Sequence, residues 1–477
     1  MQDRKDLKQA EQAHLAEAYA KNPELFEQRT YVDDAETLAE FGIHVPGKTD
    51  FVPAVLKLWP EDFIVEEVAT DGAVYTIAPG NTPPKIGEGT TVFATLVKCG
   101  LSTFEAVDDI ARHLGIPKDH ISYAGIKDKD ALTSQRISIR GAQIEAVAAC
   151  GSPYYFLKDI EVGKGVIEKG RLKGNRFTVL VRTAKPLSDP THNAAVSEAL
   201  ARVSRDGFYN FFYLQRFGTP RLTNFRWARD IIRGNFEKAA HDILSHTSER
   251  ELSYFKNLRT QMHEKFGDWE AVHNIIAPYP IIFVHEHKLV DHLRQHPGDY
   301  LGALKTIPEQ ITLWVYALAS LFFNAKISEH LIRSQEPPKE LPFFLSPDKV
   351  DQELYREMLE NQGLYPLSLQ HVRQFPNIQV KKRMTPTKDH ARIVNGELLP
   401  EGLLLEFELG KGQYATTFLS HLFNLTSGLP AQDCAKNRID TKKILNEVPV
   451  AEVLPYFESV IQPKGVNMFE VIGGKEE

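Results

Sequence analysis

The chain has 477 residues, of which 42% are apolar, and its formal net charge is −7 with a sequence pI near 6.2. This length and apolar content allow a large buried core divided over two or three domains. The acidic balance argues against a nonspecific nucleic-acid binder.

The cysteines and the apolar runs exclude several other classes. Cys99, Cys150 and Cys434 are far apart and odd in number, so they form neither a metal-ligand spacing nor a disulfide framework. This usage fits a reducing compartment, and we expect a cytoplasmic protein. Residues 1–28 are charged throughout and do not resemble a signal peptide. The longest apolar run, Leu313–Phe323, is shorter than the roughly 20 residues of a membrane helix, so we expect a buried helix and no membrane partner.

Basic side chains are clustered although the total charge is negative. The clusters are Lys164–Lys185, Arg216–Arg233 and Lys381–Arg392. Such stripes are compatible with contacts to nucleic-acid phosphates, because local distribution matters more than the total charge. Charge alone does not establish that function.

The chain begins with an arm, residues 1–45, that alternates charged and alanine-rich helical stretches. It is either a packed surface helix or a mobile extension, and the sequence leaves both open. From Ala54 the string AVLKLWPEDFIVEEV predicts strand structure. Pro60 interrupts it, which is typical of an edge or a bulge.

The next stretch predicts a strand, a helix and a second strand. Thr91–Lys98 has a strand pattern, and Ser102 with Glu105 forms a capping box that begins a helix. Gly115 is expected to end that helix. The strand beyond Tyr123 completes the passage.

The segment Tyr123–Arg140 combines a charged turn with an alternating strand. Lys127, Asp128, Lys129 and Asp130 are adjacent, and the alternation from Arg136 predicts a strand with one buried face. On composition alone the plain interpretation is a solvated charged turn. A charged loop at the end of a strand is also a suitable place for chemistry.

The same segment carries a resemblance to a known family. Six positions over eleven residues match G-x-K-D-x-x-A-x-T-x-Q, and they are Gly125, Lys127, Asp128, Ala131, Thr133 and Gln135. This pattern resembles the signature of TruD-type tRNA pseudouridine synthases. The resemblance implies that the catalytic aspartate is Asp128, not Asp130, and that Gln135 helps to position the loop or the base.

Two further motifs of that family occur on either side of the signature. The string K-x-x-P-E-D-F-x-V-x-E, from Lys57 to Glu67, is similar to the family's opening motif. The resemblance implies that Lys57 lies near the catalytic aspartate, where a cation typically lowers a carboxylate pKa by about 1–3 units. The alternative is an ordinary exposed lysine. G-N-x-F, at Gly174–Phe177, resembles another motif of the family. It implies that Asn175 helps to hold the site and that Phe177 stacks on the target uracil, and such stacking is worth about 1–3 kcal/mol per base. The alternative is that Phe177 belongs to the hydrophobic core.

The segment Asn210–Gly218 resembles the family's N-x-x-G-x-Q-R-F-G. Tyr213 stands where the family usually has glycine, so its backbone must take a negative φ to avoid strain. We expect Arg216 and Phe217 to take part in substrate binding. For Arg216, a phosphate contact and a bracing role in the loop are weighed evenly.

The resemblance also predicts the domain organisation and the fold. Helical sequence follows Gly218, where such enzymes carry an inserted domain, and alternation at Leu403–Leu409 predicts a strand with one wet face. Gln413–Leu419 then resembles the family's closing Y-A-T motif. The predicted fold is α+β: a mixed pseudouridine-synthase sheet flanked by helices and interrupted by a mainly helical insertion. The expected boundaries are 1–45 for the arm, 46–218 and 375–477 for the catalytic domain with its C-terminal tail, and 219–374 for the insertion.

The implied reaction needs no cofactor and no metal, because pseudouridine formation involves no redox change and no group is gained or lost. A carboxylate with an unperturbed pKa near 3.9 is already ionised at neutral pH, so it can attack without a partner base. The hypothesis is that Asp128 attacks the nucleotide while Lys57 orients it. By resemblance the substrate is uridine 13 of tRNA, with other structured RNAs left open, and we expect a monomer.

Two rival functions remain open at this point. One is an RNA-binding protein that kept the fold and lost the activity; the intact G-x-K-D motif argues against it. The other is a hydrolase that uses Asp128 and Asp130 as a pair, which requires both acids to face one cleft.

Overall fold

The structure is a computed structural model, and it describes residues 4–80, 82–430 and 433–463. The chain divides into two compact units. The first, here called the sheet unit, comprises Gly47–Phe208 and Asp389–Gly465; the second, here called the helical unit, comprises the chain up to Pro46 and Tyr209–Lys388. The expected insertion, 219–374, falls inside the helical unit, which also includes the arm. The end of the predicted C-terminal tail, 464–477, lies outside the described residues.

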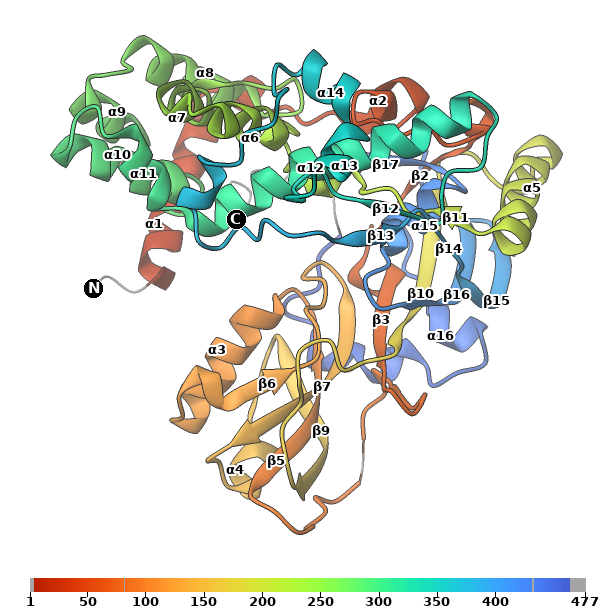
Figure 1. Ribbon diagram of the computed structural model, residues 1–477. Coiled ribbons are helices and arrows are strands. Elements are labelled where there is room, and N and C mark those ends of the chain that lie inside the picture. Colours follow the sequence, from red (N-terminus) through yellow and green to blue (C-terminus); the bar gives the residue numbers. More distant parts are fainter. Residues whose placement is uncertain (1–3, 81, 431–432, 464–477) are drawn as a thin grey trace. The chain divides into compact units, whose positions relative to one another are not determined.

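The sheet unit is built on a mixed β-sheet (Figure 1). In this unit the strand order is β17-β2-β10-β3-β7-β5-β9-β8. In addition, β16 pairs with β10, and β15 pairs with β16. The longer strands are β3 (Phe63–Val68), β5 (Thr91–Lys98), β7 (Leu132–Arg140), β9 (Tyr155–Gly163), β10 (Gly174–Thr183), β15 (Arg392–Leu399), β16 (Gly402–Gly410) and β17 (Asn424–Gly428). The shorter ones are β2 (Pro53–Val55), β4 (Val74–Tyr75), β6 (Ile121–Tyr123) and β8 (Gly151–Ser152). β3 and β7 are parallel, while β5 pairs antiparallel with both β7 and β9.

Short helices accompany these strands. They are α3 (Thr103–Leu114), α4 (Ile144–Ala148), α5 (Pro190–Asp206), α15 (Ala415–Ser420) and α16 (Thr441–Ile444). α3 begins at the predicted capping box, in which Ser102 and Glu105 each accept from the other's main-chain N–H. It ends at Gly115, whose φ of 65° is the left-handed conformation that favours glycine. Helices and a mixed sheet give the α+β fold that the sequence predicts.

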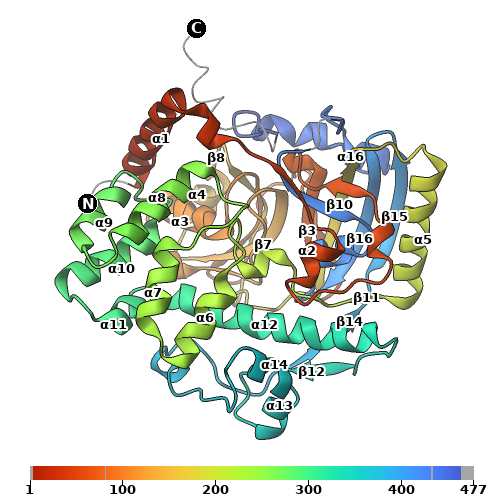
Figure 2. The same ribbon diagram turned by 90° about the horizontal axis from the view of Figure 1, so that it is seen from above.

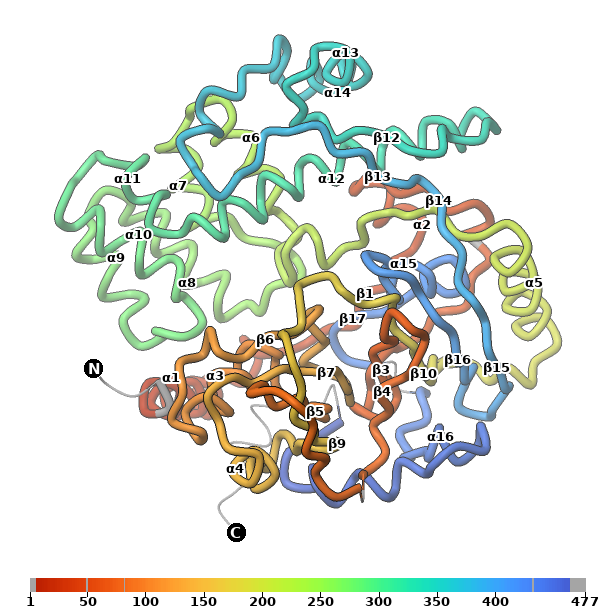
Figure 3. Tube along the Cα trace, turned by 60° about the horizontal axis from the view of Figure 1, so that its bottom comes forward, coloured from red at the N-terminus to blue at the C-terminus, as the bar shows by residue number. Residues whose placement is uncertain are grey.

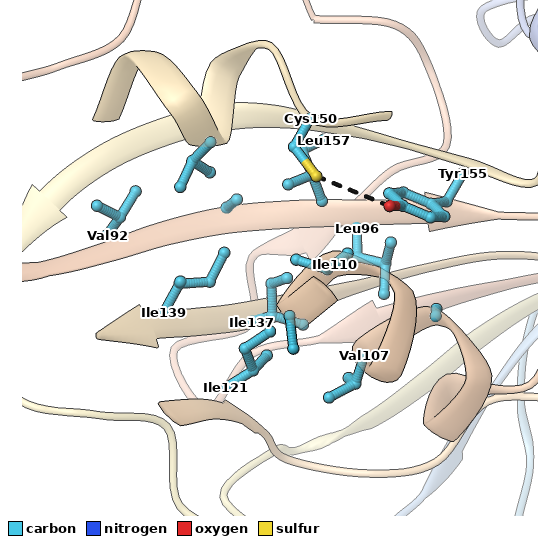
Figure 4. Packing of buried hydrophobic residues seen from close by; sticks show 14 of the residues in the cluster. Val92, Leu96, Val107, Ile110, Ile121, Ile137, Ile139, Cys150, Tyr155 and Leu157 are labelled. Carbon is cyan, nitrogen blue, oxygen red and sulfur yellow. Dashed lines mark hydrogen bonds between the residues drawn. The ribbon is translucent and has the colours of Figure 1, made fainter. Parts of the chain in front are cut away.

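The core beside α3 fixes the strand that follows the charged loop (Figure 4). Ile137 and Ile139 of β7 are fully buried and belong to one cluster with Val107 and Ile110 of α3. The opposite face of β7 is also buried, because Arg136 forms an ion pair with Glu161 inside the sheet unit. The alternation predicted only one buried face on this strand, and that prediction is wrong because both faces are buried.

β16 departs from its expected pattern in the same way. β10, β16 and β15 run side by side (Figure 3), and β16 pairs with β10 from Gly174–Gly410 to Arg182–Gly402. Leu404 and Glu406, which were expected on a wet face, are buried. Arg176 of β10 lies 3.4 Å from Glu406, so the charge on this face is partly compensated inside the protein.

The helical unit consists mainly of helices, seen from above in Figure 2. These are α1 (Arg4–Lys21), α2 (Ala35–Ala39), α6 (Asn224–Arg233), α7 (Phe236–Ser245), α8 (Ser253–Glu264), α9 (Trp269–Ile276), α10 (Val284–Gln295), α11 (Tyr300–Lys305), α12 (Pro308–Ile332), α13 (Lys349–Glu353) and α14 (Arg356–Asn361). The strands are β1 (Thr30–Val32), β12 (Glu340–Pro342) and β13 (Met384–Pro386). After the first part of the sheet unit, the chain enters the helical unit through β11 (Phe208–Tyr209) and leaves it through β14 (Lys388–Asp389). α12 is long and apolar enough to span a membrane, but 67% of that stretch is buried within the protein, as in a core helix.

The N-terminal arm is packed within the helical unit. The Glu11 carboxylate accepts hydrogen bonds from the main-chain N–H groups of Ile281 and Ile282, at 2.8 and 3.1 Å. Tyr213 has a φ of −77°, as expected for a residue in place of glycine, and its hydroxyl donates to Asp33 of the arm at 2.8 Å. Of the two interpretations of the arm, the packed one holds for its described residues.

Candidate active site

The loop between β6 and β7 carries Asp128, whose side chain is 48% exposed. The ammonium of Lys57 lies 3.4 Å from its carboxylate oxygen Oδ2. The same ammonium lies over the Phe63 ring, 4.4 Å from the centroid, and the Lys57 side chain is only 12% exposed. Two strand-end segments far apart in the sequence therefore place an anchored cation against an accessible carboxylate.

Lys57 holds this position with a strained backbone. Its φ is 58°, in the left-handed region that residues other than glycine seldom adopt. Such a conformation costs of the order of 1–3 kcal/mol and persists only where the surroundings impose it. The strain lies at the residue that contacts Asp128, which is the pattern of a functional position.

A second lysine supports the loop from inside. Lys98, at the end of β5, is 0% exposed, and its ammonium donates to the main-chain carbonyls of Asp128 at 2.6 Å and Leu101 at 2.8 Å. Burial lowers the pKa of Lys98 to about 8, and the nearby negative charge of Asp128 opposes that change. The lysine is still mostly protonated at pH 7, so it places a positive charge beside the loop that carries Asp128.

The residue before Asp128 is held by a buried ion pair. The Lys127 ammonium lies 2.7 Å from Glu67 Oε2 of β3, and both side chains are almost completely buried. The same ammonium donates to Asn175 Oδ1 at 2.8 Å. Asn175 thus contacts the loop through Lys127, which places it where the sequence expected a residue that holds the site.

Gln135 is fully buried and braces the loop. Its side-chain amide nitrogen donates to the Gly125 carbonyl at 3.0 Å, and its amide oxygen accepts from the Thr103 hydroxyl at 3.0 Å. The Thr103 hydroxyl in turn accepts from the main-chain N–H of Lys127 at 3.0 Å. This placement is that of a supporting residue.

Phe177 lies on β10 behind the charged residues. Its ring stacks on Phe407 with centroids 5.2 Å apart and an interplanar angle of 13°, and it meets Phe63 edge-on at 6.0 Å. The residue is only 5% exposed. The chain of contacts from Asp128 through Lys57 and Phe63 reaches Phe177, but a base can stack on this ring only after neighbouring side chains move.

The acids of the opening motif serve the architecture. Asp62 forms a doubly hydrogen-bonded ion pair with Arg182 of β10, at 2.7 and 2.8 Å, and both side chains are fully buried. Burial raises the pKa of Asp62, while the guanidinium opposes that rise. Glu61 similarly pairs with Arg438. The Asp62–Arg182 pair fixes the start of β3 beside β10, and the Glu61–Arg438 pair joins the same turn to the C-terminal segment.

The remaining predicted site residues belong to the helical unit. Arg216 is half-buried, with its guanidinium over the Phe212 ring at 5.1 Å. Phe217 is 0% exposed and packs between Phe41 and Phe225. That is a core position, so burial gives no support to direct substrate contact by Phe217.

Sequence reasoning missed Lys98 and the partner role of Glu67. Nothing in TVFATLVK marks the last lysine as buried, because a lysine that ends a strand is usually solvated. Glu67 matches a position of the opening motif, but the motif does not indicate which residue it pairs with. In the described ranges, no group of histidine, cysteine and acidic side chains is arranged to hold a metal ion.

The fold is that of a solved structure. A crystal structure described as TruD from Methanosarcina mazei matches with a TM-score of 0.58 and 23% identity, over 81% of this chain and 97% of that one. At this identity the similarity shows the fold, and the class follows from the family model: a pseudouridine synthase, which is an isomerase. The family model for tRNA pseudouridine synthase D (TruD) matches residues 48–340. The chain belongs to the TruD family.

Relatives agree with this assignment over most of their length. A protein of Methanopyrus kandleri named probable tRNA pseudouridine synthase D is 29% identical over 357 residues, which cover 70% of this chain and 86% of that one. The tRNA pseudouridine synthase D of Geobacter sp. strain M21 is 27% identical over 426 residues, which cover 80% of this chain and 98% of the relative.

Proposed function

We propose that this chain converts uridine 13 of tRNA to pseudouridine and that Asp128 is the nucleophile. The supporting observation is the Lys57–Asp128 contact at 3.4 Å, at a carboxylate that is half exposed while Lys98 and Lys127 beside it are buried. Family membership supports tRNA as the substrate class. The particular uridine is the part that the experiment below tests.

The reaction exchanges one glycosidic bond for another. The bond between ribose C1′ and uracil N1 breaks, the base turns, and a bond from C1′ to C5 forms. The proton on C5 is released and N1 gains one, so the product is an isomer of the substrate. Asp128 attacks the nucleotide and later leaves it, and no electron acceptor takes part.

Each supporting side chain has a separate task. Lys57 orients the carboxylate through their ion pair at 3.4 Å. Lys98 holds the main chain of the loop, and Asn175 and Gln135 hold the part before Asp128 through Lys127 and Gly125. Phe177 supplies an aromatic wall for the uracil once the base is turned out of the RNA, which costs a few kcal/mol and less in a loop than in a stem.

The site of modification is tested with tRNA transcripts. We expect pseudouridine at position 13 of a transcript treated with the protein, mapped by chemical labelling and reverse transcription. A matched transcript with cytidine at position 13 should remain unmodified. Modification of that control at another uridine would reject uridine 13 and keep the enzyme class.

We also propose that the enzyme works as a cytoplasmic monomer without a cofactor. The three cysteines are buried and unpaired, which fits a reducing compartment. Activity of a gel-filtered monomer fraction in excess EDTA is the expected result. Activity confined to a dimer fraction, or lost in EDTA and restored by a metal, would overturn this proposal.

A further inference from the structure

A pocket of about 980 Å³ lies within the helical unit, apart from any residue assigned to the reaction. It is formed between the arm, from Tyr31 to Phe41, and the segments at the start of α6 and after α7. Its polar lining includes Arg221, Arg226, Arg229, His246 and Arg250, and we call it the arginine pocket. The volume is at the upper end of the roughly 300–1,000 Å³ usual for ligand pockets.

Two of its four arginines have an acidic partner on another segment of the chain. Arg250 lies 3.2 Å from Asp33 of the arm, and Arg221 lies 3.7 Å from Glu286. The acids in the lining are Glu249, which pairs with Lys256 at 3.2 Å, and Glu40, which is exposed. The charge left over must therefore come from the other two arginines.

Of these two, Arg226 carries uncompensated charge, and Arg229 carries an unpartnered donor. Arg226 is exposed and has no ion pair with any residue in the described ranges. Arg229 lies 3.7 Å from Asp230, and its Nε is buried with no hydrogen-bond partner among the described residues. The two side chains are three residues apart on α6, so they lie on one side of the helix. Burial and the charges of Arg226 and Arg221 lower the pKa of His246, which agrees with a positive potential in the pocket.

The start of α6 adds main-chain donors. The helix begins at Asn224, and Thr223 before it makes no capping bond with its side chain. Thr223 lines the pocket and is only 6% exposed, and its hydroxyl has no partner in the part of the chain that the structure describes. Helix N-termini bind anions through free N–H groups and the helix dipole. An unpartnered buried hydroxyl beside two available guanidinium groups indicates a ligand with acceptor oxygens.

Aromatic side chains complete the lining. Phe225 is half-buried, and the Arg226 guanidinium lies 5.8 Å from its ring centroid. Tyr31 is also half-buried, and its hydroxyl donates to the Glu249 carbonyl at 2.6 Å. Rings beside phosphate-binding groups are the combination that proteins use for unpaired nucleotides.

We infer that the arginine pocket binds one unpaired nucleotide of the substrate RNA, with its phosphate on Arg226, Arg229 and the start of α6 and its base against Phe225. The identity of that RNA rests on the proposed function. The arm supplies one wall, so it becomes part of the RNA-binding surface. A free nucleotide has the same chemistry, and the experiment separates the two sources.

The test compares two double variants of the full chain. Arg226→Gln/Arg229→Gln removes both charges without adding an acid. Arg333→Gln/Arg373→Gln is the matched control, because both arginines are exposed residues of the same unit that neither line the pocket nor belong to a basic cluster. Binding of an unmodified tRNA transcript is measured between low and moderate salt, and turnover is measured at saturating RNA. Circular dichroism and thermal melting verify that each variant is folded.

We expect the pocket variant to bind tRNA about tenfold or more weakly and its salt slope to fall by about one, since the pocket holds one phosphate and each phosphate contact contributes about one. Turnover at saturating RNA should stay within twofold of the wild type, and Arg226→Lys/Arg229→Lys should recover most of the salt slope. The control variant should match the wild type. Equal tRNA binding by a folded pocket variant and the wild type would overturn the inference.

Free adenosine 5′-monophosphate distinguishes the source of the nucleotide. If it binds the wild type but not the pocket variant while tRNA affinity is the same in both, the pocket takes free nucleotides and the RNA inference fails. If the pocket variant loses tRNA affinity while the wild type makes no pseudouridine, the pocket inference stands and the proposed function fails.

Discussion

The ammonium of Lys98 lies 2.6 Å from the main-chain carbonyl oxygen of Asp128, so a fully buried cation holds the residue that carries the accessible carboxylate. The same ammonium donates to Leu101 and, at 3.4 Å, to the carbonyl of Lys127. Three carbonyls need three donors, which a protonated lysine has and a neutral one lacks. The charge state of Lys98 therefore sets how firmly the loop is held.

This predicts a loss of turnover as the pH rises through about 8, the pKa to which burial lowers Lys98. The pKa of this lysine in the unfolded chain is 10.5, so its contribution makes the fold more stable between these values as the pH rises. A fall in activity there is then not caused by unfolding through Lys98. In Lys98→Arg, which stays charged, the basic limb of the kcat profile should move to higher pH. An unchanged limb in Lys98→Arg would remove Lys98 from the mechanism.

Lys57 is predicted to contribute to activity and not to stability. Glycine adopts the observed φ of 58° without strain, so Lys57→Gly should keep the free energy of unfolding within about 1 kcal/mol of the wild type. Turnover should fall on the order of a hundredfold, because the carboxylate loses its only ion-pair partner among the described residues. Denaturant unfolding and single-turnover kinetics measure the two quantities. A large loss of stability with normal turnover is the opposite result and would contradict this assignment.

The buried pair of Lys127 and Glu67 is predicted to couple strongly. Glu67→Gln or Lys127→Met alone leaves one buried charge without its partner and should cost about 3–5 kcal/mol of unfolding free energy. The double variant should recover much of that loss. A double-mutant cycle by urea denaturation gives the coupling energy, and additive single effects would show that the pair does not act as a unit.

Glu406 predicts a pH-dependent stability. Burial first, and then a hydrogen bond with Glu447, raises the pKa of Glu406 to about 7 from the ordinary 4.5. Its contribution is fully present below pH 4.5 and is lost as the pH rises through 7. The melting temperature of Glu406→Gln should therefore increase relative to the wild type between pH 5.5 and pH 8.

Glu408 on the same strand is the control for that experiment. Its pKa is lowered: burial is the largest effect and raises it, but hydrogen bonds and charges from Arg392 and Arg176 together outweigh burial. A lowered carboxylate pKa gives a contribution that is constant above the ordinary value of 4.5. The melting difference for Glu408→Gln should stay constant between pH 5.5 and pH 8. A constant difference for Glu406→Gln as well would contradict the assigned titration.

Local signals in the sequence predicted local structure well. The Ser102–Glu105 capping box and the glycine at position 115 fix both ends of α3, because each acts within one turn of its own backbone. The family motifs likewise located the charged loop and the strands around it. These features need no knowledge of what packs against them.

Burial of the polar strand faces depended on distant residues and was not predicted. Arg136 is buried because Glu161 lies two strands away in the sheet, and Asp62 is buried because Arg182 reaches it from a strand 120 residues later in the chain. Alternation distinguishes apolar from polar positions, but it does not show which polar positions are exposed to solvent and which are buried by other segments. Lys98 was missed for the same reason, since its partners are main-chain carbonyls of a loop about 30 residues away.

The central claim is that the Asp128 carboxylate attacks the nucleotide, and release of tritium from C5-labelled tRNA tests it most directly. The wild type should release the label, and Asp128→Asn should lose on the order of a thousandfold or more in rate while it binds the tRNA with nearly the same affinity. Asp130→Asn is the matched control and should stay active. Label release by Asp128→Asn at the wild-type rate would contradict the account, and no release by either protein with intact binding would favour an RNA binder.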